Sequence, residues 1–435
     1  MGRNLIKTKV LSKPADALPV DRPAGEERGK VPLFAQSDEN LVYKDVFLID
    51  SSDQSRQTNF MVLLNSETGN FIISNGRRYS YFAGNNYLGL AGDARIKTAV
   101  IRAVEKYGVN FSASRHTTGT ADIHLELESA LASFKGVEDA VVFASGYQGN
   151  SILLEVLKGS YSTVFIDQSA HASILAAIPS NVSGVIFYDH CDADHLDQLL
   201  EKSGSTDPMV ITDGIFPLTG EIAPLDAIFP VVRKHRGILV VDDAHATGVL
   251  GDTGKGTPEH FGLCGEEGIH QTETMSKALG GYGGFISGSR TLTSLIRDHS
   301  TTYQASTALP PPIVAAGIAS LGILGDSPDL RLRLLETALY LRKEIAGIGY
   351  RTTDCRTPII PVIFDAPEKA RDLSHFLEEH GVIVPFMNYP VRKEMHQVRI
   401  AVSVSHTEEQ VSQLLELLKK WKTKNENSQD QKSSY

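Results

Sequence analysis

Short apolar runs alternate with segments of helical periodicity between about residues 140 and 290. Five runs are rich in Val, Ile and Phe: AVVFAS, TVFID, GVIFYD, PMVITDGIF and GILVVDDA. Between them lie stretches with apolar residues three and four positions apart, such as GNSILLEVL and DADHLDQLLEKS. This alternation predicts βαβ crossovers in a mainly parallel sheet with helices on both faces. With HQTETMS and GGFISGS added, we expect a seven-stranded sheet in an α/β fold.

The chain on either side of this region has a different pattern of apolar and polar residues. An arm of about 40 residues, rich in Pro, Asp, Glu and Lys, precedes three short apolar stretches, VFLID, FMVLL and NFIIS, and NGRRY predicts a hairpin turn. After about residue 350, runs such as TPIIPVIF alternate with helical patterns again. We therefore expect an N-terminal arm and small β segment over 1–80, a large domain over 81–325, a smaller C-terminal α/β domain over 326–422 and a disordered tail over 423–435.

Composition and charge narrow the class of protein. The 435 residues are 41% hydrophobic and 22% charged, as is usual for a globular chain of two domains. The formal net charge of −10 disfavours a nucleic-acid partner. No apolar run reaches the ~18 residues that a membrane span needs, so PIVAAGIASLGIL predicts a buried helix. Three scattered cysteines without a CxxC pair favour inert thiols in the cytoplasm over disulfides or a zinc site.

Polar residues directly after the predicted strands are candidates for a site, because ligands of open α/β sheets bind at the carboxyl ends of the strands. Ser145, Gly146 and Tyr147 lie between a strand and a helix, where backbone N–H groups and the helix dipole favour a phosphate. Glycine is also common in such turns for structural reasons. Neither a P-loop nor a GxGxxG motif is present.

Two further strands end in residues with acid–base chemistry. Asp242 and Asp243 follow GILVV, and burial of either carboxylate is costly unless a cation meets it, so Asp242 requires a positive partner. The alternative is a helix N-cap beside a surface His245. His171 follows TVFID, where an imidazole can stack on a planar ligand or exchange protons, although a lone histidine is more often structural.

Lys277 lies in the segment HQTETMSKALGGYGGF, close to Thr274 and a run of glycines. A surface lysine is the alternative, but a desolvated amine near another cation loses its proton and becomes a nucleophile toward aldehydes. One lysine, one acid, one stacking imidazole and one phosphate cradle are the four functions that pyridoxal 5′-phosphate (PLP) requires. The sequence therefore predicts a PLP site.

Eight segments resemble a known family: GNNYLGL, SGYQGN, DQSAHAS, TDGIFPLTGEIAPL, VVDDAHATGVLG, TMSKALGGYGGF, STALPP and VRIAVSVSHT. In this order, over about residues 70–420, the chain resembles the α-oxoamine synthases. These are fold-type I, PLP-dependent transferases that include 8-amino-7-oxononanoate synthase, glycine C-acetyltransferase, 5-aminolevulinate synthase and serine palmitoyltransferase. The resemblance implies that 81–325 is the PLP-binding domain and that the protein is a homodimer with sites at the subunit interface.

The resemblance also implies roles for the candidate residues. Lys277 forms the Schiff base with PLP and later removes the substrate α-proton. Asp242 pairs with the pyridinium nitrogen, His245 bonds the phenolic oxygen and His171 stacks on the ring. The phosphate is held by Ser145, Gly146, Tyr147 and Thr274, joined by Ser306 or Thr307 of the partner subunit.

Two more residues match positions that contact the amino-acid substrate. Arg399 corresponds to the arginine that grips the carboxylate as a bidentate fork, and Asn85 corresponds to a substrate-contacting asparagine. Pro217 departs from the family, which usually has a serine there whose hydroxyl helps to hold the phenolic oxygen of PLP; proline has no donor to offer.

The implied reaction is the decarboxylative condensation of an amino acid with an acyl-CoA thioester. ALGGYGG, STALPP and TPIIPV resemble 8-amino-7-oxononanoate synthase more than its siblings, whereas the long N-terminal segment is more similar to serine palmitoyltransferase, and a glycine C-acetyltransferase-like activity is a further option. Two other functions stay open: an aminotransferase or lyase on the same cofactor, and a noncatalytic partner subunit. Such subunits lack the lysine, which is present here as Lys277.

Overall fold

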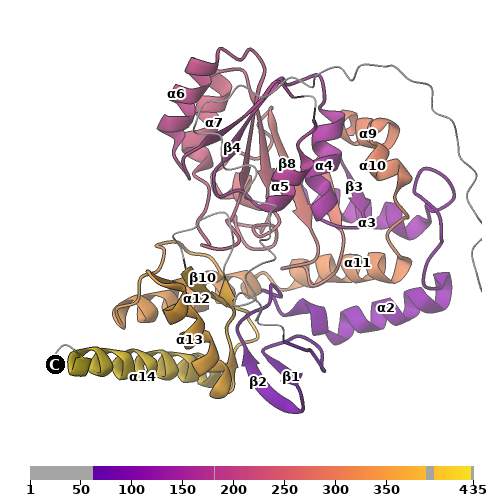
Figure 1. Ribbon diagram of the computed structural model, residues 1–435. Helices are drawn as coiled ribbons and strands as arrows, with labels where there is room; N and C mark the ends of the chain where they lie inside the picture. The colour runs from indigo at the N-terminus through magenta and orange to yellow at the C-terminus, as the bar shows by residue number, and fades with distance from the viewer. Residues whose placement is uncertain (1–61, 181, 388–395, 433–435) are drawn as a thin grey trace, which may run out of the picture. The chain divides into compact units, whose positions relative to one another are not determined.

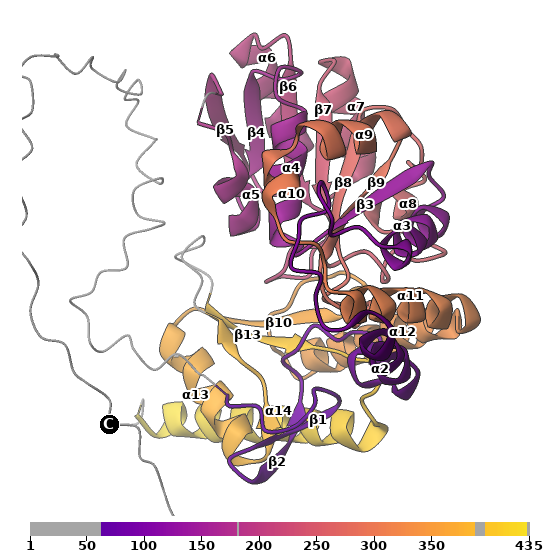
Figure 2. The ribbon, with the colours of Figure 1, turned by 90° about the vertical axis from the view of Figure 1, so that its right-hand side faces the viewer.

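The computed structural model describes residues 62–180, 182–387 and 396–432, which all fall within one compact unit (Figures 1 and 2). Seven strands form the central sheet: β3 (Asp139–Phe143), β4 (Thr163–Asp167), β5 (Gly184–Tyr188), β6 (Pro208–Asp213), β7 (Ile238–Asp242), β8 (Ile269–Thr274) and β9 (Gly284–Gly288). Their order is β3-β9-β8-β7-β6-β4-β5, and only β9 is antiparallel to its neighbours in this sheet. The predicted mainly parallel, seven-stranded sheet is confirmed.

Helices cover both faces of this sheet (Figure 2). One face packs against α4 (Tyr147–Val156), α5 (Ala172–Ala177), α9 (Arg290–His299) and α10 (Thr301–Ala305). The other packs against α3 (Asp122–Lys135), α6 (Ala193–Ser203), α7 (Leu225–Lys234) and α11 (Pro311–Asp326). Within β3, Val141 and Phe143 face the first layer, whereas Ala140 and Val142 face the second. This alternation explains why the strands are apolar at every position.

Two small sheets form the rest of the fold. β10 (Ile359–Phe364), β13 (His396–Ala401) and β12 (Phe386–Met387) make an antiparallel sheet, while β1 (Phe71–Ser74), β2 (Arg77–Tyr81) and β11 (Val382–Ile383) make a mixed one. Asn75 and Gly76 connect β1 to β2 with φ of 51° and 77°, the left-handed pair that a two-residue hairpin turn needs. The hairpin predicted from NGRRY is confirmed, and it pairs with a strand from the C-terminal region.

The remaining helices are η2 (Leu90–Gly92), α2 (Ala94–Tyr107), α8 (Thr257–His260), α12 (Asp329–Gly347), α13 (Pro367–Glu379) and α14 (Glu408–Lys432). The predicted buried helix PIVAAGIASLGIL lies within α11. No single helix in the described part of the chain is long and apolar enough to cross a membrane; α11 and α12 together reach that length and composition but are bent by 81°.

The expected disordered tail over 423–435 is wrong for residues 423–432, which continue α14. The physical reason is that this polar stretch contains no Gly or Pro, and its Lys, Glu and Gln residues are good helix formers, so nothing ends the helix that begins at Glu408. The arm over about residues 1–40 and the VFLID stretch lie outside the described residues. The domain boundaries at residues 81 and 325 stay predictions.

Candidate active site

Lys277 follows β8 in a tight turn at the carboxyl edge of the central sheet. The turn closes when the N–H of Gly280 donates to the Lys277 carbonyl at 3.0 Å. Gly280 has φ of 61°, and a Cβ there would lie 2.5 Å from the backbone nitrogen of Ala91. The glycine run beside the lysine therefore serves a left-handed turn and a close backbone approach.

Burial lowers the pKa of the Lys277 amine to about 8, although the negative charges of Asp242 and Asp213 act in the opposite direction. The positive charge of Arg399 lowers this pKa further. Among the described residues, no hydrogen bond or ion pair holds the amine. A substantial fraction of Lys277 is thus neutral near physiological pH and free to act as a nucleophile or a base.

Asp242 is the last residue of β7, and its carboxylate is held in one orientation. Nδ2 of Asn150 donates to its Oδ2 at 2.8 Å, and the backbone N–H of Ala244 donates to its Oδ1 at 3.2 Å. Oδ1 of Asn150 in turn accepts from the Thr272 hydroxyl at 2.9 Å. This second bond fixes which way the Asn150 amide points. Asp242 is buried, so it presents an oriented negative charge inside the fold.

His171 is the N-cap residue of α5 and lies within the electrostatic reach of Asp242 and Lys277. Its Nδ1 accepts the backbone N–H of Ser173 at 3.2 Å, which leaves the ring proton on Nε2. Burial lowers the pKa of His171, as does the Lys277 charge, while Asp242 raises it. The backbone N–H of His171 donates to Oδ2 of the buried Asp213 at 2.8 Å. This bond ties the histidine to the end of β6.

The residues of the predicted phosphate cradle lie at the start of α4. Gly146 is the N-cap residue, and the backbone N–H of Tyr147 donates to the Ser145 hydroxyl at 3.3 Å. A Cβ on Gly146 would lie 2.7 Å from Cβ of Thr274, so only glycine allows β8 to approach this helix end so closely. The Thr274 hydroxyl lies 3.0 Å from that of Ser276 and donates to the Gly283 carbonyl at 2.9 Å. Ser145, Gly146, Tyr147 and Thr274 are thus brought together as expected.

Arg399 lies on β13 and reaches the same region from the small antiparallel sheet. Its Nε donates to the Pro217 carbonyl at 2.6 Å, and its Nη2 donates to Oδ1 of Asn85 at 3.0 Å. Pro217 lacks a hydroxyl, yet its backbone carbonyl orients the guanidinium. The two predicted substrate residues, Arg399 and Asn85, are therefore hydrogen-bonded to each other. Pro217, the residue that departs from the family pattern, contributes its backbone carbonyl to orient Arg399.

His245 is buried close to this guanidinium. Its Nδ1 lies 2.7 Å from the hydroxyl of Tyr87. Burial, with the positive charges of Lys277 and Arg399, lowers the pKa of His245 well below its usual range, so the ring is neutral.

The model of the aminotransferase class I and II family matches residues 80–418. The chain belongs to this family. Among curated relatives, the 8-amino-7-oxononanoate synthase of Symbiobacterium thermophilum is 39% identical over 346 residues, covering 79% of this chain and 88% of the relative. The 8-amino-7-oxononanoate synthase of Lysinibacillus sphaericus is 37% identical over 351 residues, covering 80% of this chain and 90% of the relative.

Solved structures of two members of this family have the same fold. Serine palmitoyltransferase from S. paucimobilis with bound PLP matches with a TM-score of 0.79 and 27% identity, covering 83% of this chain and 92% of that one. The 8-amino-7-oxononanoate synthase from Francisella tularensis matches with a TM-score of 0.69 and 25% identity, covering 80% and 98%. Within the class I and II family the chain is an α-oxoamine synthase, a PLP-dependent acyltransferase of fold-type I.

The residues of this α-oxoamine synthase fit PLP chemically. An aldehyde needs an amine that loses its proton easily, and burial provides this at Lys277. A ring nitrogen needs an oriented carboxylate, which Asn150 provides at Asp242. A phosphate needs a helix start without a side chain in the way, which Gly146 provides.

Three residues that contact the predicted set were not found from the sequence: Tyr87, Asn150 and Asp213. Asp213 follows PMVIT in the same way as Asp242 follows GILVV, so the strand-end rule signals it. Asn150 stands one helical turn after Tyr147, on the helix face that meets the sheet. Tyr87 lies within the GNNYLGL segment beside Asn85, but only the fold shows that its hydroxyl meets His245.

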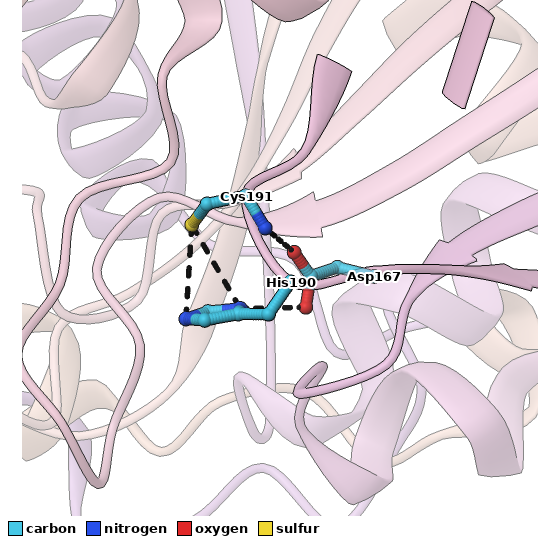
Figure 3. A group of neighbouring side chains, drawn as sticks. All are labelled: Asp167, His190 and Cys191. Atoms are coloured by element: carbon cyan, nitrogen blue, oxygen red, sulfur yellow. Dashed lines mark hydrogen bonds and ion pairs between the residues drawn. The ribbon is translucent and has the colours of Figure 1, made fainter. Parts of the chain in front are cut away.

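A second polar cluster lies at the ends of β4 and β5, outside this set (Figure 3). His190 donates from Nδ1 to Asp167 at 2.8 Å and from Nε2 to Glu221 at 3.1 Å. Burial lowers the pKa of His190, but hydrogen bonds to Asp167, Cys191 and Glu221 outweigh it and raise the pKa to about 11. Sγ of Cys191 is 3.7 Å from both ring nitrogens, facing the ring. Asp167, His190 and Cys191 are ligand types within reach of one ion. Both ring nitrogens of His190 face carboxylates, so we interpret the cluster as an imidazolium bridge.

Proposed function

We propose that this α-oxoamine synthase catalyses the decarboxylative condensation of an amino acid with an acyl-CoA thioester, in the manner of 8-amino-7-oxononanoate synthase. The observation that carries the proposal is the lowered pKa of the Lys277 amine. Burial lowers this pKa to about 8, in a site where Asp242 and Arg399 are close enough to influence it. Support for the substrate class comes from relatives named 8-amino-7-oxononanoate synthase at 37–39% identity.

The residues of the chain have separate roles at this site. PLP, when bound, supplies an electron sink for charge that develops at the amino-acid α-carbon. Arg399 binds the substrate carboxylate through Nη1, because Nε donates to Pro217 and Nη2 donates to Asn85, which holds the guanidinium in place. The neutral Lys277 amine accepts the α-proton. Asp242 stabilises a protonated ring nitrogen.

The two histidines have separate roles in this proposal. His171 would stack on the cofactor ring when it is bound, and its Nε2–H would be available to donate to the thioester oxygen as negative charge develops there. His245 would donate to the phenolic oxygen of the cofactor. Ser145, Gly146, Tyr147 and Thr274 would hold its phosphate.

We also propose that the protein is a cytoplasmic homodimer. Exposed large apolar residues support a partner surface: Val109, Leu125, Tyr147 and Tyr282 are 70%, 57%, 55% and 53% exposed. Ser306 or Thr307 of the partner subunit would complete the phosphate site, although Ser306 of the same chain already accepts from Gln148 at 3.3 Å. The three cysteines are free, which suits a reducing compartment. Light scattering on purified protein measures the mass, and a monomer at assay concentration contradicts the dimer.

The function is tested by incubating PLP-loaded protein with L-alanine, glycine or L-serine and acyl-CoAs of graded chain length. We expect CoA release and stoichiometric carbon dioxide with one pair, and neither product with Lys277→Ala. Alanine with a medium-length dicarboxylic acyl-CoA supports the 8-amino-7-oxononanoate synthase reaction. Serine with a long acyl chain indicates a serine palmitoyltransferase, and glycine with acetyl-CoA a glycine C-acetyltransferase.

Two outcomes contradict the proposal. Transfer of the amino group to a 2-oxo acid without CoA release indicates an aminotransferase. Protein that binds no PLP in excess cofactor, and releases no CoA with any pair, indicates a noncatalytic subunit.

A further inference from the structure

The hydroxyl of Tyr87 lies at the meeting point of three functional side chains. It is 2.7 Å from Nδ1 of His245, 3.2 Å from Oδ1 of Asn85 and 3.4 Å from Nη2 of Arg399. Tyr87 has no exposed surface, so water does not compete for these bonds. The hydroxyl thus connects the guanidinium to the imidazole.

The number of protons on these groups determines which of them donates in each hydrogen bond of the Tyr87 hydroxyl. A guanidinium only donates, so Arg399 donates to the Tyr87 oxygen. The hydroxyl then has one proton for two acceptors, Asn85 and His245. Oδ1 of Asn85 already accepts from Arg399 at 3.0 Å. The 2.7 Å contact with His245 is short for an N–H donor and usual for an O–H donor, so the hydroxyl proton points to the imidazole.

We propose that Tyr87 donates to Nδ1 of His245 and thereby keeps the ring proton of the neutral imidazole on Nε2. Tyr87 is a positioning residue: it acts by selecting the tautomer of His245, the histidine that we propose contacts the cofactor. The inference rests on the proposed function, in which His245 donates to the phenolic oxygen of PLP. The other tautomer would present a lone pair to that oxygen and repel its negative charge.

The arrangement also links the two ends of the site. Arg399 donates to the Tyr87 oxygen, and a hydroxyl that accepts a charged hydrogen bond is a stronger donor in turn. The residue that binds the substrate carboxylate therefore strengthens the bond that fixes His245.

The first test is the tautomer itself, measured by ¹⁵N NMR on the full-length chain labelled at histidine, with and without PLP. His245→Gln identifies the resonances by their loss. We expect a pyrrole-like Nε2 and a pyridine-like Nδ1 at His245 in both samples. A pyrrole-like Nδ1 would reverse the direction of the Tyr87 bond and overturn the proposal.

The second test uses Tyr87→Phe, which removes the donor and keeps the ring. We expect His245 to populate the Nδ1–H form, and kcat of the loaded enzyme to fall about 10- to 100-fold, as when the outer hydrogen bond of a metal-bound imidazole is removed. Tyr350→Phe is the matched control, because the Tyr350 hydroxyl is also buried and donates to the Leu418 carbonyl at 2.9 Å. An unchanged His245 tautomer in Tyr87→Phe overturns the proposal.

A third variant keeps the test decisive if Tyr87→Phe does not fold. Asn85→Ala removes the competing acceptor and leaves the Tyr87–His245 pair intact, so we expect the His245 tautomer to be unchanged. A shift of tautomer would mean that the Tyr87 proton had been on Asn85. The NMR result does not depend on turnover: wild-type protein that releases no CoA refutes the proposed function, whereas an active wild type with the wrong tautomer refutes only the role of Tyr87.

Discussion

The side-chain amide of Asn150 donates to Oδ2 of Asp242 at 2.8 Å, and its own oxygen is occupied by the Thr272 hydroxyl. A buried carboxylate that must face a ring nitrogen depends on such a partner, because without it the charge is poorly stabilised and free to rotate. The helix α4 thus both starts at Gly146, in the proposed phosphate cradle, and orients the carboxylate that we propose faces the ring nitrogen.

Asn150→Leu keeps the volume of the side chain and removes the bond to Asp242. We expect PLP to bind about tenfold more weakly, which corresponds to roughly 1.4 kcal/mol, and absorbance titration of cofactor-free protein measures this. Asn70→Leu is the control, since Nδ2 of Asn70 donates to Gln410 at 2.9 Å in another part of the fold. Equal PLP affinities for wild type and Asn150→Leu would show that Asp242 needs no such support.

The lowered pKa of Lys277 predicts how cofactor capture depends on pH. Only the neutral amine attacks an aldehyde, so the rate of PLP capture by cofactor-free protein should rise with pH and level off above about 8. Arg399→Gln removes a positive charge that lowers this pKa, and the inflection should move to higher pH. Stopped-flow absorbance records the rate, and Lys277→Ala gives the baseline. An inflection near 10.5, the value of an ordinary lysine, contradicts the prediction.

The sequence was sufficient for much of the site because parallel strands present the residues that follow them at one edge. Lys277 and His171 each follow such a strand and Asp242 is the last residue of one, and the structure puts them within electrostatic range of one another. Tyr87 and Asn150 could not be placed in this way. Their partners are fixed by how a loop and a helix pack against the sheet, which periodicity does not encode.

The secondary structure, like the site, could be predicted from the sequence only in part. The Asn75–Gly76 turn was predictable because few residue pairs accept two left-handed conformations. The end of α14 was not, because a polar composition is typical both of a solvated helix and of a disordered tail.

The close approach of Gly146 to Thr274 predicts a loss of phosphate binding in Gly146→Ala. The added methyl group would lie 2.7 Å from Cβ of Thr274 and 2.8 Å from its Oγ1, so the helix start or the end of β8 must shift. We expect PLP affinity to fall about tenfold or more while the protein stays folded. Gly322→Ala is the control, because it lies in α11 with nothing within 4 Å of the new methyl group. Equal PLP affinities for Gly146→Ala and Gly322→Ala would refute this account of the cradle.

Asp243, the neighbour of Asp242, is fully buried and has different hydrogen-bond partners from Asp242. Burial raises its pKa from 3.8 to about 6, although Lys135 and hydrogen bonds from Thr257 act to lower it. The Thr257 hydroxyl donates to Oδ1 at 2.6 Å, and Nε2 of Gln271 donates to Oδ2 at 2.7 Å. These donors reduce the free-energy cost of burying the Asp243 carboxylate but do not return its pKa to the usual value.

The raised pKa of Asp243 sets the sign of a stability change. Between about pH 4 and pH 6 the folded state binds more protons at this residue than the unfolded state, so its contribution to the free energy of unfolding falls as pH rises. The contribution is fully present below pH 3.8 and is lost as pH passes through about 6. A shift of this size corresponds to about 3 kcal/mol.

Asp243→Asn removes the titration and retains a carbonyl oxygen for Gln271 and the Thr257 N–H. Relative to wild type, the variant should therefore become more stable as pH is raised from 4.5 to 7, by about 2 kcal/mol, the part of the full contribution that titrates in this window. Denaturant unfolding at both pH values measures the difference, and Asp354→Asn, at an exposed loop position, should show none. A difference between Asp243→Asn and wild type that is the same at both pH values would mean that Asp243 is ionised in the folded state throughout, with the Lys135 charge compensating for its burial.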